Sequence, residues 1–142
     1  MAITYENVIF DRVIDSLQSL IADEFNIQVY FDEHVGNQSF LITPVEDLLE
    51  DSLTSGQVRH YSISIEYQLQ SAGNYTKNSV KQVSEITERM KRLLYNNRNY
   101  TVAGTTLFYN GIIENIAYER DEDDKDILRS NTSFTCTTME LV

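Results

Sequence analysis

Two hydrophobic periods divide the chain into helical and extended segments. From Tyr5 to about Glu24, apolar side chains recur at three- and four-residue spacing with polar ones between them, which predicts an amphipathic helix. The same spacing predicts a second helix from Ser79 to about Tyr95. Each of these helices has one apolar face, so each needs another element to pack against.

The clearest strand signal runs from Val58 to Gln70, where apolar side chains occupy every second position. Its apolar face consists of Tyr61, Ile63, Ile65, Tyr67 and Leu69. Shorter extended stretches are predicted at residues 27–32 and 40–42, the latter ending near Pro44. The acidic stretch after Pro44 is expected to be a short helix or a loop.

The last third of the sequence is predicted to be β. Strands are expected at residues 100–109, 112–118 and 128–142, with a tight turn at Asn110-Gly111. The apolar positions change parity between Cys136 and Met139, which predicts a bulge there. Helix, strands, helix, strands is an order that predicts one α+β domain over residues 1–142, with a mostly antiparallel mixed sheet and two helices packed on one face.

The composition agrees with a folded chain and limits its partners. The 142 residues suffice for one domain, and 42% of them are hydrophobic. Acidic residues number 22 against 11 basic ones, a formal charge of −11. Such a charge disfavours binding to duplex DNA or to an anionic membrane, because phosphate binding needs clustered Lys and Arg.

The acidic residues concentrate in two segments, which are candidates for a channel lining or a partner surface. The first segment holds Glu46, Asp47, Glu50 and Asp51, and the second holds Asp121, Glu122, Asp123 and Asp124. The simpler interpretation is that both segments only keep the protein soluble.

Residues that could carry chemistry are few. Cys136 is the single cysteine, which excludes an internal disulfide and suits a reducing cytosol. His34 and His60 lack metal-ligand spacing. The run from Asp121 does not match a calcium loop, because its sixth and twelfth positions are Asp126 and Thr132 rather than Gly and Glu.

No signal peptide, membrane-spanning run or phosphate-binding glycine loop is recognisable in the sequence. A pair of catalytic carboxylates remains open, but nothing singles one out. We therefore expect no enzymatic activity, no metal and no cofactor.

The layout resembles that of the tail terminator proteins of tailed bacteriophages, also called tail completion or head-to-tail joining proteins. The resemblance runs from about Val8 to Leu141 and rests on three segments. These are the strand VRHYSISIEYQL, the helix SVKQVSEITERMKRLL and the closing pair YNGIIENIAYERDEDDKDILRSNTSFTCTTMELV. The match is architectural, since the family has no catalytic signature.

This resemblance implies a structural virion protein that forms a ring, usually six-fold, on the tail tube. The ring would end tube polymerisation, join the tube to the head or neck, and let DNA pass without specific contacts. Its partners would be copies of itself, the tail-tube protein and a head-completion or neck protein, with no membrane. The protein would be found in the host cytoplasm during assembly and at the head-tail junction of the virion.

Two alternatives stay open at the level of sequence. One is a neck or head-completion adaptor. The other is a small acidic protein-binding module, unrelated to virions, whose charge mimics nucleic acid.

Overall fold

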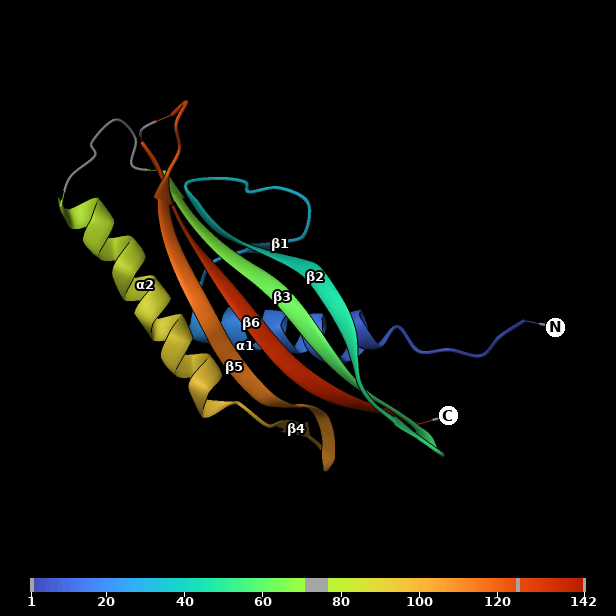
Figure 1. The fold of residues 1–142 in the computed structure, drawn as a ribbon. Coiled ribbons are helices and arrows are strands. Elements are labelled where there is room, and N and C mark those ends of the chain that lie inside the picture. The colour runs from blue at the N-terminus through green and yellow to red at the C-terminus, as the bar shows by residue number, and fades with distance from the viewer. Residues whose placement is uncertain (1, 71–76, 125, 142) are drawn as a thin grey trace.

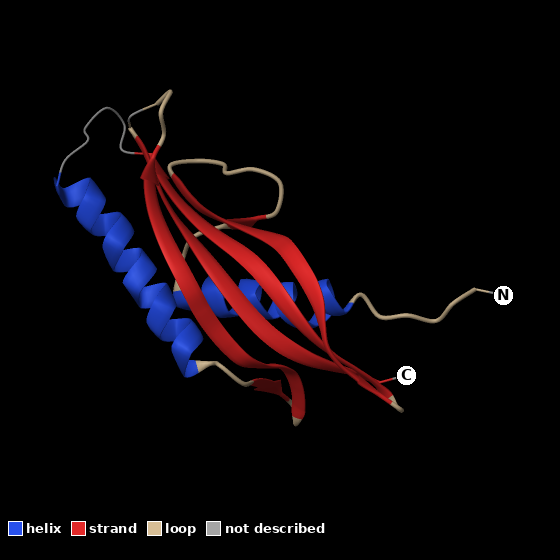
Figure 2. Ribbon diagram, viewed as in Figure 1, coloured by secondary structure: helices blue, strands red, loops and turns tan. Residues whose placement is uncertain are grey.

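The hydrophobic core lies between two helices and one face of a twisted sheet (Figures 1 and 2). The computed structural model describes residues 2–70, 77–124 and 126–141. Its elements are, in chain order, η1 (Ile9–Ile14), α1 (Asp15–Glu24), β1 (Val29–Tyr30), β2 (Gln38–Leu53), β3 (Gly56–Gln70), α2 (Lys77–Asn96), β4 (Tyr100–Val102), β5 (Thr105–Arg120) and β6 (Ile127–Leu141).

The six strands are ordered β1-β2-β3-β6-β5-β4. Only the short β1–β2 pair is parallel, and every other neighbouring pair is antiparallel. The predicted fold class, an α+β protein with a mostly antiparallel mixed sheet, is therefore confirmed.

The two predicted helices exist and both pack on the apolar face of β3. Leu17 and Ile21 of α1 and Met90 and Leu94 of α2 are buried in the same cluster as Ile63. The N-terminal helix begins near Val8, later than predicted, and its first part is the π-helical stretch η1. Figure 1 shows α1 crossing behind the strands and α2 running beside β5.

The acidic stretch after Pro44 is not a short helix or a loop, so that expectation is wrong. It continues β2, which pairs with β3 as far as Leu53↔Gly56. Proline lacks an amide hydrogen and is tolerated where a strand lies at an edge or beside a bulge. Pro44 meets both conditions, since a register shift separates it from Glu46 and β2 has no outer neighbour there among the described residues.

A tight turn lies at Ala103-Gly104, and the predicted one at Asn110-Gly111 is not formed. Both turn residues have positive φ, 51° and 81°, and they join the pair Val102↔Thr105. Asn110-Gly111 instead sits within β5, where the register with β6 shifts and Asn110 has a φ of 53°. A left-handed residue can make a bulge as well as a hairpin turn, which is why the dipeptide misled the prediction.

The predicted bulge in β6 is also absent, because β6 pairs with β3 in unbroken register from Ile127 to Leu141. The change of parity reflects a change of environment. Cys136 faces the helices, whereas Met139 lies on the opposite face, beyond the end of the core.

Candidate interaction surfaces

The free edge of β2 is the first exposed surface. β1 covers β2 only at Phe40 and Leu41, so the outer edge from Ile42 onward has no strand neighbour among the described residues. An uncovered edge presents unpaired backbone amides and carbonyls to other chains. Large apolar side chains lie there in the open: Val45 is 66% exposed and Leu49 is 54% exposed.

The end of the sheet formed by this edge projects beyond the helices (Figure 1). We call it the arm: β2 residues 43–53, β3 residues 56–60 and β6 residues 137–141, paired side by side. On the face away from the helices the register aligns Val58 with Met139 and Asp51. On the helix side the contacts are polar, with Arg59 donating to Asp47 at 2.8 Å. The face away from the helices is therefore partly apolar, while the helix side carries polar contacts beside the exposed Leu49.

The structure distributes the first acidic segment over this edge. Glu46 and Asp51 pair with residues on the face away from the helices, and both are exposed. Asp47 is on the opposite face, where Arg59 neutralises it. Glu50 accepts a hydrogen bond from the hydroxyl of Thr137 at 3.4 Å. The segment thus offers three carboxylates that have no ion pair within the described part of the chain.

The second acidic segment lies in the turn between β5 and β6. The carboxylate of Asp121 accepts hydrogen bonds from the backbone amides of Asp123 and Asp124, each at 2.9 Å. It also pairs with Arg129 at 2.8 Å. The amide of Asp124, the guanidinium of Arg129 and the amide of Asp123 together lower the pKa of Asp121. Asp121 therefore shapes the turn, while Glu122 and Asp123 are exposed.

The two acidic segments do not meet. The arm and the β5–β6 turn lie at opposite ends of the sheet (Figure 1), because β6 runs the whole distance between them. They are therefore separate surfaces.

A serine, a histidine and a glutamate lie together on the open face of the sheet. His34 Nδ1 is 2.7 Å from Ser39 Oγ, and its Nε2 is 2.8 Å from Glu66 Oε1. The order matches that of a hydrolase triad, but a nucleophile must reach its substrate. Ser39 is 0% exposed, so these contacts instead fasten the segment before β2 to the sheet.

Cys136 is buried in the core. Burial raises the pKa of its thiol to about 12. The reactive thiolate is thus scarce at neutral pH, and the residue acts as a small apolar side chain.

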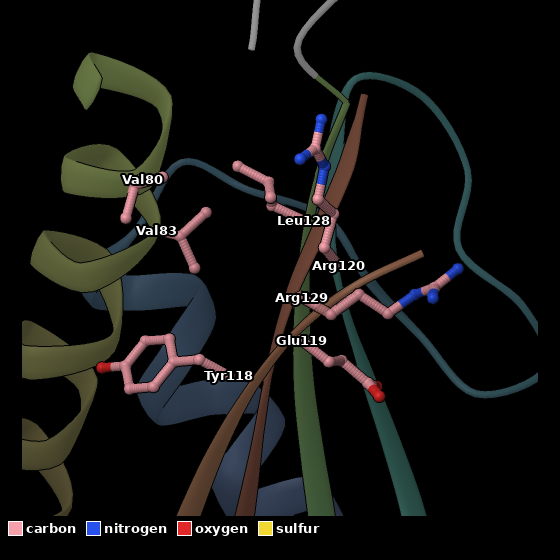
Figure 3. A pocket seen from close by; sticks show the side chains of 7 residues that line it. All are labelled: Val80, Val83, Tyr118, Glu119, Arg120, Leu128 and Arg129. Atoms are coloured by element: carbon pink, nitrogen blue, oxygen red, sulfur yellow. The ribbon is translucent and has the colours of Figure 1, made fainter. Parts of the chain in front are cut away.

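A hollow of about 210 Å³ opens between α2 and the end of the β5–β6 pair (Figure 3). Val83 and Leu128 point toward one another across it, and Tyr118 points toward the helix. Glu119 and Arg129 direct their charged ends to the other side of the sheet (Figure 3). The hollow is mainly apolar. Its volume could accept one side chain of a partner and is below the volume usual for small-molecule sites.

The margin of the sheet opposite β2 carries a surface that the sequence reasoning missed. Arg92 and Arg98 flank the ring of Tyr95 at the end of α2, and Ile112 of β5 lies beside them. The signal in the sequence was the run of residues 89–98, which holds four basic and no acidic side chains. We call Lys91, Arg92, Tyr95, Arg98 and Ile112 the basic patch.

Across the described residues, no group of three or more His, Cys, Asp or Glu side chains is placed to hold a metal ion. In the same part of the chain, no helix has the length and apolar character needed to cross a membrane.

Fold and surfaces together define a small α+β protein with an open sheet, and comparison with solved structures agrees. A chain in the virion of the native gene transfer agent (GTA) particle matches with a TM-score of 0.53 and 14% sequence identity. The match covers 93% of this chain and 92% of that one, so the two share their fold over nearly their whole lengths. No protein-family model matches this chain, and no curated protein does.

Proposed function

We propose that this chain is a structural virion protein that forms a ring on a phage-like tail tube, ends tube polymerisation and joins the tube to the head or neck. The observation that carries the proposal is the fold shared with a chain of a gene transfer agent virion over 93% of the residues. A match that spans both chains is what a common structural role in a particle would produce.

The exposed margins of the sheet support self-association. Subunits that pair side by side need two different surfaces at opposite margins, and a contact of that kind generates rings or filaments. Here β2 leaves its outer edge open, and β5 is covered by β4 only from Thr105 to Phe108. A large apolar side chain lies at each margin, Leu48 at 52% exposed and Ile112 at 55% exposed.

The charge fits a role at a DNA passage. A subunit of charge −11 repels phosphates, so DNA would slide past a ring of such subunits instead of adhering. In this proposal the exposed carboxylates of the arm or of the β5–β6 turn face the lumen or a partner, and each is tested by replacement with Lys.

Removal of the chain from particles under assembly tests the function. Without it, we expect tail tubes of uncontrolled length and heads without tails, seen by electron microscopy, and the purified protein should restore joining. Tubes of normal length on unjoined heads would contradict termination and favour a neck adaptor. Normal particles would overturn any virion role and leave the protein-binding module.

A ring is tested directly by the mass of the purified protein in solution. Light scattering over a range of concentrations, with and without isolated tail tubes, should reveal a closed oligomer. A monomer under every condition would overturn the proposal.

A further inference from the structure

The basic patch has the composition of a protein-binding site. Tyr95 is 57% exposed, and the guanidinium of Arg98 lies 4.6 Å from its ring centroid. Arg92 lies over the same ring at 5.9 Å. Tyr and Arg are the residues most often found at the energetic centre of interfaces, because they combine apolar area with directed hydrogen bonds. Here the stacking holds both guanidinium groups in place before any partner arrives.

The charge of this patch lacks a balancing partner. Within the described part of the chain, neither Arg92 nor Arg98 forms an ion pair with a carboxylate, whereas Lys91 pairs with Glu88 at 2.8 Å. Beside them a hollow of about 360 Å³ is lined by Leu94, Ile112 and their neighbours. The patch is therefore complementary to an acidic partner surface that also carries an exposed apolar side chain.

The free edge of β2 has the complementary character. Glu46, Glu50 and Asp51 are exposed carboxylates without an ion pair among the described residues. Val45 precedes Glu46 and Leu48 lies between Glu46 and Glu50 in the strand, and their side chains are 66% and 52% exposed. We call residues Val45 to Asp51 the acidic strip.

The strand register places Glu46 of the acidic strip level with Ile112 of the basic patch. Glu46 pairs with Ser62, Ser62 with Thr135, and Thr135 with Ile112. One row across four strands thus runs from the acidic strip at one margin to the basic patch at the other. Copies set side by side with their strands aligned bring Glu46 of one copy level with Ile112 of the next, without a shift along the strands.

We propose that the acidic strip of one copy docks on the basic patch of a second copy. Because the two surfaces differ and lie at opposite margins, the contact is heterologous, and each added copy offers the next a fresh patch. The proposal rests on the proposed function in requiring self-association, and it names the residues that provide it.

Charge reversal on each side tests the contact. Arg92→Glu with Arg98→Glu, and separately Glu46→Lys with Asp51→Lys, should each raise the concentration needed for assembly by about tenfold or more, since like charges then face each other. All four changes in one chain restore opposite charges, and so should restore assembly. Sedimentation velocity measures the mass, and unchanged circular dichroism and unfolding midpoints show that these exposed positions leave the fold intact.

Matched controls sit away from the proposed contact. Lys81→Glu reverses a basic residue at the other end of α2, and Asp15→Lys with Asp23→Lys reverses two exposed acids of α1. All of these should assemble like the unchanged protein. Added salt should weaken assembly of the unchanged protein, because exposed charges are screened.

The outcomes separate this proposal from the proposed function. Rings that persist after both reversals would overturn the docking assignment and leave the ring itself standing. Loss of binding to a DNA duplex in Arg92→Glu with Arg98→Glu, with an unchanged ring mass, would make the patch a phosphate site and overturn the docking. An unchanged protein that never assembles would overturn both proposals.

Discussion

Thr87 of α2 and Ser130 of β6 share a hydrogen bond of 2.6 Å in the centre of the protein, where both residues are 0% exposed. The hydroxyl of Thr87 already donates its only proton to the carbonyl of Val83 at 2.7 Å. Ser130 must therefore be the donor in the contact between them. This contact fixes α2 on the sheet at one angular position, which apolar packing alone does less sharply.

The first prediction concerns this pair. Thr87→Val leaves the Ser130 hydroxyl buried without its partner, which should lower the free energy of unfolding by about 1–3 kcal/mol. Thr87→Val with Ser130→Ala removes both groups, so it should cost less than the sum of the single changes. Urea denaturation of the four proteins measures the coupling, and additive costs would contradict it.

The second prediction concerns the core. Leu17 and Ile63 are 0% and 1% exposed and belong to one cluster. Truncation of either to Ala should lower the free energy of unfolding by about 2–5 kcal/mol, through lost burial and the cavity left behind. Leu48→Ala on the exposed arm is the control and should change it by less than about 0.5 kcal/mol. Equal midpoints for all three variants would show that the core is elsewhere.

The third prediction concerns acid stability. The folded pKa of Asp121 lies below its ordinary value of 3.8. The stabilisation that follows is present above the unfolded pKa and is lost as pH falls through the folded one. The midpoint temperature of thermal unfolding should therefore decrease as the pH is lowered below about 4, and it should decrease less steeply in Asp121→Asn. Asp123→Asn, an exposed neighbour, serves as control, and identical acid profiles for Asp121→Asn and the unchanged protein would contradict the assignment.

The fourth prediction concerns Cys136. With the pKa of its thiol raised to about 12 by burial, the folded protein should resist a disulfide reagent at pH 8 and react fully once unfolded. Ser133→Cys in a Cys136→Ser background puts a thiol on an exposed position of the same strand. This control should react rapidly in the folded protein. Rapid reaction of Cys136 itself would show that the core opens easily.

The sequence predicted those elements whose two faces meet different environments. β3 alternates because the helices cover one face only, and the two helices show their stripes for the same reason. In β2 the residues beyond Ile42 are exposed on both faces. Apolar and polar residues therefore do not alternate there, and the sequence pattern does not predict a strand. The turn at Ala103-Gly104 was missed because alanine rarely adopts positive φ.

The candidate surfaces divide in the same way. The acidic segments were visible as composition, but only the register shows that Asp47 faces Arg59 while Glu46 lies on the other face. The basic patch depends on the turn after α2, where the amide of Gly111 donates to the carbonyl of Arg98 at 2.9 Å. That contact joins Arg98 to β5 across a reversal of the chain, which residue spacing does not reveal.

The position of β6 has a consequence for the order of events during synthesis. β6 follows every other strand in the chain, yet it lies between β3 and β5 and joins them. While a ribosome is still making residues 127–141, the strand that pairs with both β3 and β5 is missing, and contacts so distant in sequence form late. A nascent chain thus lacks the strand that fixes the position of the acidic strip relative to the basic patch. If subunits assemble as proposed, completion of β6 would be a timing step that keeps unfinished subunits out of the ring.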